Sequence, residues 1–244
     1  VASSIMTKDQ QRAAISAYLG LVSFMDAQVG RVLDALDAAG LRDSTRILYT
    51  SDHGENAGAR GLWGKSNHYQ EAVRIPMIVA GADTPFGKVV DTPVSLVDVY
   101  PTILDCVGTP VVDKDLPGRS LFGLIEARED RERIVFSEYH AAGSPSASYM
   151  LRKGRFKFIY YVGYAPELFD LEADPEETHN LAGAPEHVAT VRDLEVELRK
   201  IVDPEKEDAR ANEAQRKLIE SKGGPEEVMA KVAMKKLYTP VPGG

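Results

Sequence analysis

The stretch that decides the fold is Arg46-Ile47-Leu48-Tyr49-Thr50-Ser51-Asp52-His53-Gly54, a strand-like apolar run that ends in an Asp-His pair and a glycine. Upstream, residues 8–39 carry apolar side chains at spacings of three and four, which predicts a long amphipathic helix. Downstream come a glycine-punctuated loop over 54–64, an apolar run over 75–80 and a short helix over 101–107. Helix, strand, loop, strand and helix in this order predict an α/β domain.

The pattern changes after residue 133. Four short β-like runs, at 134–139, 149–152, 155–162 and 168–171, are separated by Gly, Pro and Ser. The pair Lys153-Gly154 is typical of a hairpin turn. These runs predict a small antiparallel sheet, with a helix over 186–202 packed on its flank. The charged residues beyond Pro204 predict a helical tail that is solvated or packs on another subunit.

Composition and charge narrow the classes of function. The 244 residues carry a net charge of −8, which argues against nucleic acid as a partner. No apolar run approaches the roughly 20 residues that span a bilayer, so we expect no membrane partner. The single cysteine, Cys106, cannot form an internal disulfide, and this leaves the compartment open between cytoplasm and periplasm.

The Asp52-His53 pair is the first candidate site. Ligands of α/β sheets bind at the carboxyl ends of strands, where this pair lies. A carboxylate and an imidazole from one turn can reach one divalent cation, and such donors suit Ca²⁺, Mg²⁺, Mn²⁺ or Zn²⁺. The alternative is that Asp52 only closes a turn beside an incidental histidine.

A family resemblance adds to this interpretation. The sequence resembles the second signature region of the sulfatases of the alkaline-phosphatase superfamily and of the related phosphonate monoester hydrolases. The segments that carry the resemblance are Thr50-Ser51-Asp52-His53-Gly54-Glu55, Gly61-Leu62-Trp63-Gly64-Lys65, residues 68–76 (HYQEAVRIP), residues 96–104 (LVDVYPTIL) and residues 168–177 (LFDLEADPEE) with Asn180-Leu181. They lie in the order found in the C-terminal halves of sulfatases.

The resemblance implies a role for four residues. Asp52 and His53 would be metal ligands, with Ca²⁺ favoured over Mg²⁺ or Mn²⁺, and Lys65 would hold a sulfate oxygen. His68 would donate a proton to the leaving alkoxide or contact the substrate. For the last two residues, the alternatives are an exposed surface lysine and a structural or surface histidine. Pocket walls are expected from the loops at 54–70 and 140–149.

The resemblance also implies a part that this sequence does not contain. Sulfatases attack sulfur with a formylglycine made from the Cys or Ser of a Cys/Ser-x-Pro-x-Arg motif, and no such motif occurs here, because Cys106 is followed by Val107-Gly108-Thr109-Pro110. We therefore expect the missing N-terminal half of the same protein as a partner, and no sulfatase activity from residues 1–244 alone.

The expected fold is part of an alkaline-phosphatase-like mixed sheet flanked by helices, followed by the small antiparallel sheet with its helix and a helical tail. The expected domains are the C-terminal part of the α/β catalytic domain (1–125), a small antiparallel-sheet subdomain with its helix (126–202) and a charged tail (203–244) through which a homo-oligomer could form.

The resemblance implies a sulfuric ester hydrolase that acts on a small-molecule or carbohydrate sulfate ester. A phosphonate monoester or phosphodiester hydrolase, and a non-catalytic assembly module, are the alternatives. His140 and His187 lack metal-like partners, and His179 lies in the family's Asp-Pro-Glu-Glu-Thr-His-Asn turn after the sheet. All three are expected to be structural or exposed.

Overall fold

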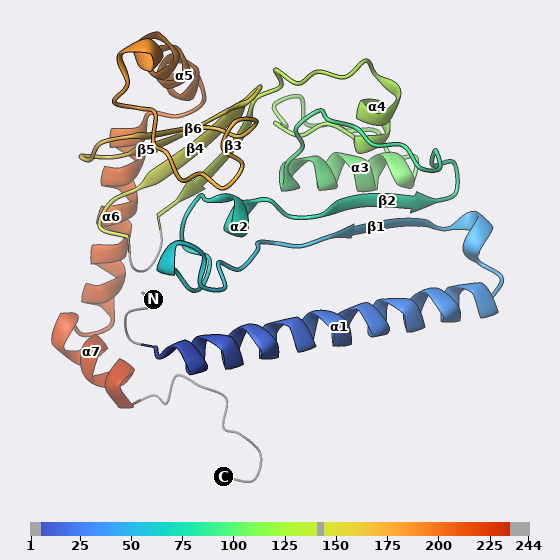
Figure 1. The fold of residues 1–244 in the computed structure, drawn as a ribbon, viewed down its shortest axis with the longest axis horizontal. Helices are drawn as coiled ribbons and strands as arrows, with labels where there is room; N and C mark the ends of the chain where they lie inside the picture. Colours follow the sequence, from blue (N-terminus) through green and yellow to red (C-terminus); the bar gives the residue numbers. More distant parts are fainter. Residues whose placement is uncertain (1–5, 141–143, 235–244) are drawn as a thin grey trace.

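The long N-terminal helix is present as predicted. The computed structural model describes residues 6–140 and 144–234 (Figure 1); residues 141–143 of the expected pocket loop and 235–244 of the expected tail lie outside this part. Helix α1 spans Lys8–Ala38. It begins with a capping box, in which the Thr7 hydroxyl accepts from the Gln10 amide and the Gln10 side chain accepts from the Thr7 amide.

Strand β1 (Arg46–Thr50) pairs antiparallel with β2 (Met77–Gly81), with Arg46 opposite Gly81 and Thr50 opposite Met77. Strand β2 begins two residues later than predicted, because Pro76 has no amide hydrogen to donate to the ladder. The parallel neighbours that a mixed sheet requires are absent from the described residues, so this sheet has two strands. The loop between the strands contains a 3₁₀ turn (Ala59–Gly61) and the short helix α2 (Gln70–Val73).

Two further helices follow β2, and a buried carboxylate fixes the chain around them. Helix α3 spans Val99–Cys106 and α4 spans Leu121–Glu126. The side chain of Asp98 is fully buried and accepts two hydrogen bonds from Arg133, at 2.7 and 2.9 Å. It also accepts from the backbone amides of Ser95 and Arg119. A buried carboxylate with this many donors ties the start of α3 to the chain that enters the second sheet.

The second sheet is antiparallel in the order β3-β4-β5-β6 (Figure 1). Its strands are β3 (Val135–Tyr139), β4 (Ser148–Lys153), β5 (Phe156–Tyr161) and β6 (Glu167–Asp170). This confirms the predicted small antiparallel sheet, including the hairpin at Lys153-Gly154, where Lys153 pairs with Phe156.

The period-two alternation of β4 and β5 gives this sheet two different faces. On one face the buried side chains of Tyr149, Leu151 and Phe158 pack against Leu194 and Leu198 of α5 (Val188–Ile201). On the other face, Met150, Ile159 and Phe169 pack against Tyr69 and Val73, which belong to the loop and helix that follow β1. The sheet therefore joins its own helix to the segment that carries the candidate site.

The tail forms two helices, α6 (Pro204–Ser221) and α7 (Pro225–Met234). The first turns of α6 are attached to the sheet, because the Tyr149 hydroxyl donates to the Pro204 carbonyl at 3.1 Å and the Ala147 amide donates to Asp208 at 2.6 Å. Beyond this attachment α6 extends away from the sheet (Figure 1).

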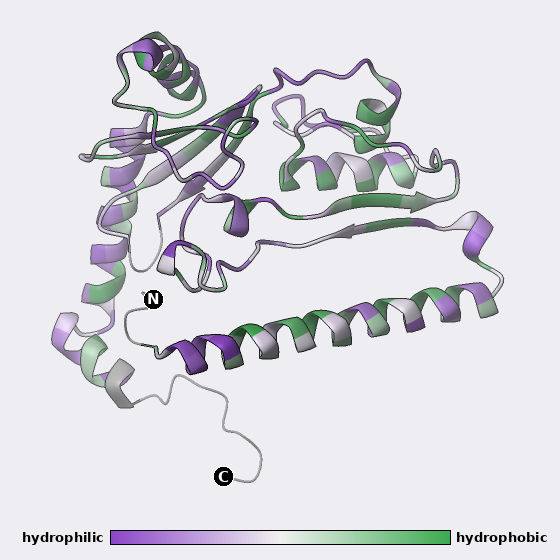
Figure 2. Cartoon of the chain, in the orientation of Figure 1, coloured by the Kyte–Doolittle hydropathy of each residue, from purple (hydrophilic) through white to green (hydrophobic). Residues whose placement is uncertain are grey.

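Helix α1 has no buried residue. It is the helix, among those the structure describes, whose length and hydropathy would allow it to cross a membrane, a test that core helices also pass. A single charged residue, Asp26, interrupts residues 13–30. Figure 2 shows apolar and polar residues alternating along it. Its exposed apolar side chains are Ile15, Tyr18, Leu19, Leu21, Val22, Phe24, Met25 and Val32.

The packing of α5 on the sheet predicts a stability effect. Leu198 is 0% exposed within the core cluster, so Leu198→Ala should lower the free energy of unfolding by about 2–5 kcal/mol through lost burial and a residual cavity. Val196 lies on the same helix at 51% exposure, and Val196→Ala should stay within about 0.5 kcal/mol. Urea denaturation of the intact protein measures both, and equal effects would contradict the proposed packing.

Candidate functional site

The turn after β1 holds the imidazole of His53, whose outer nitrogen Nε2 faces the side chains of Asp52 and Lys65. Nδ1 of His53 lies 2.9 Å from the Gly54 carbonyl oxygen, which can only accept, so Nδ1 carries the hydrogen. Nε2 lies 3.2 Å from Oδ2 of Asp52, and it offers a lone pair to a cation when it carries no hydrogen. A histidine held by a carbonyl through its other nitrogen is the usual arrangement of a metal ligand.

The carboxylate of this pair is kept ionised. The side chain of Asp52 is 80% exposed, and its amide neighbour His53 donates to Oδ1 at 3.0 Å. Desolvation acts to raise the pKa of Asp52, but the charge and backbone amide of His53, with a contribution from Lys65, hold that pKa below its ordinary value. Asp52 is therefore an anionic oxygen donor at neutral pH.

The loop after β1 brings Lys65 back to the Asp52-His53 turn, and the side chain of Glu55 holds this loop in shape. The Glu55 carboxylate accepts from the amides of Gly64, at 2.6 Å, and Ala57, at 3.1 Å, so Glu55 supports the loop. Gly64 has a φ of 85°, a conformation that favours glycine. The loop places Nζ of Lys65 in contact with Nε2 of His53. The ammonium group, the imidazole nitrogen and the Asp52 carboxylate thus converge.

His68 is more deeply buried than the other three predicted site residues. It is 2% exposed, and its Nε2 lies 3.1 Å from the hydroxyl of Ser148 on β4. Burial lowers its pKa to about 4, so the imidazole is neutral at pH 7. Its Nδ1 has no hydrogen-bond partner among the described residues.

One cavity of about 630 Å³ collects all four predicted residues, Asp52, His53, Lys65 and His68. Its far wall comes from the second sheet, which contributes residues that sequence reasoning missed: Met150, Arg152 and Lys157. The signal for them is the period-two alternation, because Ser148, Met150 and Arg152 share one face of β4. A lysine inside the apolar run Phe156-Lys157-Phe158-Ile159 was a further signal.

The other histidines and Cys106 do not join the four predicted residues at the cavity. His179 is 81% exposed beside Asp174, and His140 packs edge-on against Tyr149. Cys106, on α3, is half-buried. Within residues 6–140 and 144–234 no group of three or more His, Cys, Asp or Glu side chains is arranged to hold a metal. Asp52 and His53 are two donors that fit a divalent cation and require further ligands to enclose it.

At the end of β1 an α/β domain thus presents a carboxylate, an imidazole and an ammonium group, and its fold is alkaline-phosphatase-like, as in solved sulfatase structures. A family model described as "Sulfatase" matches residues 2–109. A second family model, described as "N-sulphoglucosamine sulphohydrolase, C-terminal", matches residues 58–204. The chain belongs to the sulfatase family and corresponds to the C-terminal region of its members.

Individual relatives agree with this assignment. Arylsulfatase K of Gallus gallus is 38% identical over 208 residues, which cover 80% of this chain and 38% of that protein. The structure of BT1596, a 2-O GAG sulfatase, is 27% identical with a TM-score of 0.74 and covers 84% of this chain and 46% of that one. A phosphonate monoester hydrolase from Silicibacter pomeroyi is 32% identical with a TM-score of 0.71, covering 80% and 42%. The chain thus spans less than half the length of each.

The buried His68 predicts a pH dependence of stability. Its pKa rises from about 4 in the folded protein to the ordinary 6.5 on unfolding, so the unfolded chain binds more protons between these values. Stability should therefore fall as pH drops from about 6.5 to about 4, by up to roughly 3 kcal/mol. Denaturation of the intact protein at pH 7 and pH 4.5 measures this loss. His68→Gln should reduce it, and an unchanged pH profile in that variant would contradict the assignment.

Proposed function

We propose that this chain supplies part of the sulfate and metal site of a formylglycine-type sulfatase, which hydrolyses a sulfate ester to an alcohol and sulfate. The observation that carries the proposal is the convergence of Asp52, His53 and Lys65 at one cavity. A cation and an ammonium group beside one another can neutralise the charge of a sulfuryl group as its S–O bond breaks.

Asp52 and His53 would hold the cation. A carboxylate oxygen and a neutral imidazole nitrogen suit Ca²⁺, and also Mg²⁺ or Mn²⁺. When bound, the cation would withdraw charge from a sulfuryl oxygen. Asp52 contributes the negative charge that attracts the ion, and the hydrogen bond from Nδ1 of His53 to the Gly54 carbonyl fixes the ring in the orientation that presents Nε2.

Lys65 would hold a sulfate oxygen. Its flexible stem ends in three donors and a point charge, and the loop held by Glu55 brings this charge to the same place as the metal ligands. A lysine that binds the oxygen more strongly as charge develops lowers the barrier of the reaction.

The nucleophile would come from the N-terminal part that the longer sulfatase relatives possess, since no Cys/Ser-x-Pro-x-Arg motif occurs in these 244 residues. The same part would cover α1, whose exposed apolar side chains run from Ile15 to Val32. Burial of such a surface favours association of the two parts of the protein.

The substrate we propose is a sulfated carbohydrate or a sulfated small molecule. The cavity of about 630 Å³ lies within the range of small-molecule sites, and the similarity to a 2-O GAG sulfatase favours a carbohydrate. Similarity to a phosphonate monoester hydrolase supports the second candidate, hydrolysis of a phosphonate monoester or phosphodiester.

Kinetics of the intact protein separate the candidates. An aryl sulfate, an aryl phosphonate monoester and a phosphodiester are compared by kcat/KM in the presence of Ca²⁺, Mg²⁺ or Mn²⁺. A preference for the sulfate supports the proposal, and a preference for either phosphorus ester supports the second candidate. No turnover of any ester would favour the non-catalytic assembly module, in which the tail joins copies of the chain.

Removing the anionic ligand should release the metal. Asp52→Ala in the intact protein should weaken metal affinity by at least about 10- to 100-fold and abolish turnover, because the cation loses a charged donor. Metal content after dialysis against a buffered metal concentration measures the first effect independently of activity. Asp193→Ala, at an exposed site on α5, is the control. Unchanged metal content in Asp52→Ala would refute the ligand assignment.

Removing the ammonium group should affect the reaction and spare the fold. Lys65→Ala should lower kcat by about 100- to 1,000-fold, comparable with the loss of one transition-state donor, while the free energy of unfolding changes by less than about 1 kcal/mol because the side chain is exposed. Lys200→Ala on α5, also exposed, should change neither quantity. A loss of stability without a kinetic defect would show that Lys65 is structural.

A further inference from the structure

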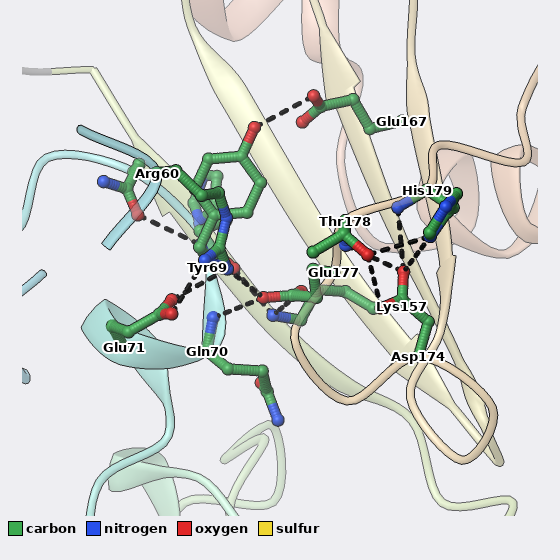
Figure 3. A network of polar contacts seen from close by, with 12 residues as sticks. Arg60, Tyr69, Gln70, Glu71, Lys157, Glu167, Asp174, Glu177, Thr178 and His179 are labelled. Carbon is green, nitrogen blue, oxygen red and sulfur yellow. Dashed lines mark hydrogen bonds and ion pairs between the residues drawn. The ribbon is translucent and has the colours of Figure 1, made fainter. Parts of the chain in front are cut away.

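The segment that carries Lys65 is held on both sides by one distant carboxylate. Arg60 lies five residues before Lys65 and Gln70 lies five residues after it. Both bind Oε2 of Glu177: the Arg60 guanidinium donates at 3.1 Å and the Gln70 backbone amide at 2.6 Å (Figure 3). Glu177 is 107 residues from Gln70 along the chain and lies after the second sheet. It therefore fixes both ends of a loop to which it has no local connection.

Glu177 is itself held in place by a buried counter-charge. The residue is 2% exposed, and its Oε1 lies 2.5 Å from Nζ of Lys157, whose side chain is 1% exposed. Lys157 also donates to the carbonyl of His68 at 2.8 Å. Desolvation lowers the pKa of Lys157 to about 8, against the opposing effect of Glu177. Two charges buried this deeply depend on one another, because removal of either leaves the other uncompensated.

Arg60 makes a second set of contacts within the loop. It donates to both carboxylate oxygens of Glu71, at 2.7 and 2.8 Å, and lies over the ring of Tyr69 at 4.3 Å from its centroid (Figure 3). The Tyr69 hydroxyl in turn donates to Glu167 of β6 at 3.0 Å. The Tyr69–Glu167 hydrogen bond joins this segment to the second sheet. The bidentate Arg60–Glu71 pair ties Arg60 to α2 in a planar geometry that a lysine could not reproduce.

The backbone is strained at both residues of the Arg60–Glu177 contact. Arg60 has a φ of 50° and Glu177 has a φ of 52°, in the left-handed region that non-glycine residues seldom adopt. Such conformations persist where surrounding contacts over-determine them, and they cluster at sites that must be held in a set geometry. Here the surrounding contacts are the three-way arrangement of Arg60, Glu177 and Lys157.

We propose that Glu177 is a positioning residue, which sets the place of the Lys65 ammonium group by holding Arg60 and the Gln70 amide. The inference rests on the sulfate-binding role proposed for Lys65. A lysine side chain has four rotatable bonds, so the position of its ammonium group depends on how firmly the backbone of Lys65 is held. Displacement of a catalytic group by about 1 Å can cost about 100-fold in rate.

Kinetics of the intact protein test the proposal through Arg60→Gln, which removes the guanidinium from Glu177 and leaves the Gln70 amide contact and the Lys157–Glu177 pair in place. We expect kcat to fall by about 10- to 100-fold while KM changes by less than about threefold. Arg60→Lys, which keeps the charge and one donor, should recover part of the loss. Equal kcat in Arg60→Gln and the unchanged protein would overturn the proposal.

A double-mutant cycle shows whether the effect passes through Lys65. In a Lys65→Ala background there is no ammonium group left to misplace, so Arg60→Gln should lower kcat by less than about threefold further. If the two substitutions multiply fully, Arg60 acts on something other than Lys65 and the proposal is wrong.

Hydrogen exchange tests the same contact without reference to activity. In the intact protein, Glu177→Gln should speed exchange of the Gln70 amide about tenfold or more, because its acceptor loses its charge. Glu176→Gln, at the exposed neighbouring carboxylate, should leave that rate unchanged. Equal rates in the two variants would overturn the proposal. If the unchanged protein hydrolyses no sulfate ester, the proposed function fails, and the exchange rates still decide whether Glu177 holds the loop.

Discussion

The buried ion pair between Lys157 and Glu177 is the constraint on which the arrangement of the site depends. It stands at the junction of three segments: β5, the turn after β6, and the loop after β1. Buried charges are costly to desolvate, and they are tolerated here because carbonyl, amide and guanidinium partners surround them. The small sheet is thereby attached to the segment that bears Lys65, so the second half of the chain takes part in shaping the site.

The two faces of the small sheet explain how it can form a core with α5 and also line the site. One face forms an ordinary apolar core with α5 around Leu198 and Phe158. The other carries Arg152 and Lys157 toward the cavity and Ser148 toward His68 of the loop after β1, together with a few apolar side chains. Because alternate residues of a strand point to opposite faces, one strand can stabilise a core and line a site at the same time.

The first part of the chain is organised differently. The side chain of Asp98 fixes Arg133 and two backbone amides, so polar contacts define the path from α3 to the second sheet. By contrast, α1 is exposed along its length, and β1 pairs with one neighbour among the described residues. Arylsulfatase K of Gallus gallus, of which this chain covers 38%, contains further chain beyond the matched region.

Local sequence patterns predicted the long helix and the strands but not the short helices α2 and α4. The apolar spacing of residues 8–39 and the alternation in residues 149–162 express contacts within a turn or between adjacent strands. The motif around Asp52, with Lys65 thirteen residues later, indicated the family because its residues lie close together in the sequence. Only the tertiary structure decided that Glu177 meets Arg60, because they lie 117 residues apart. Long-range partners of a buried charge are selected by desolvation and geometry in the folded chain, and no local periodicity encodes them.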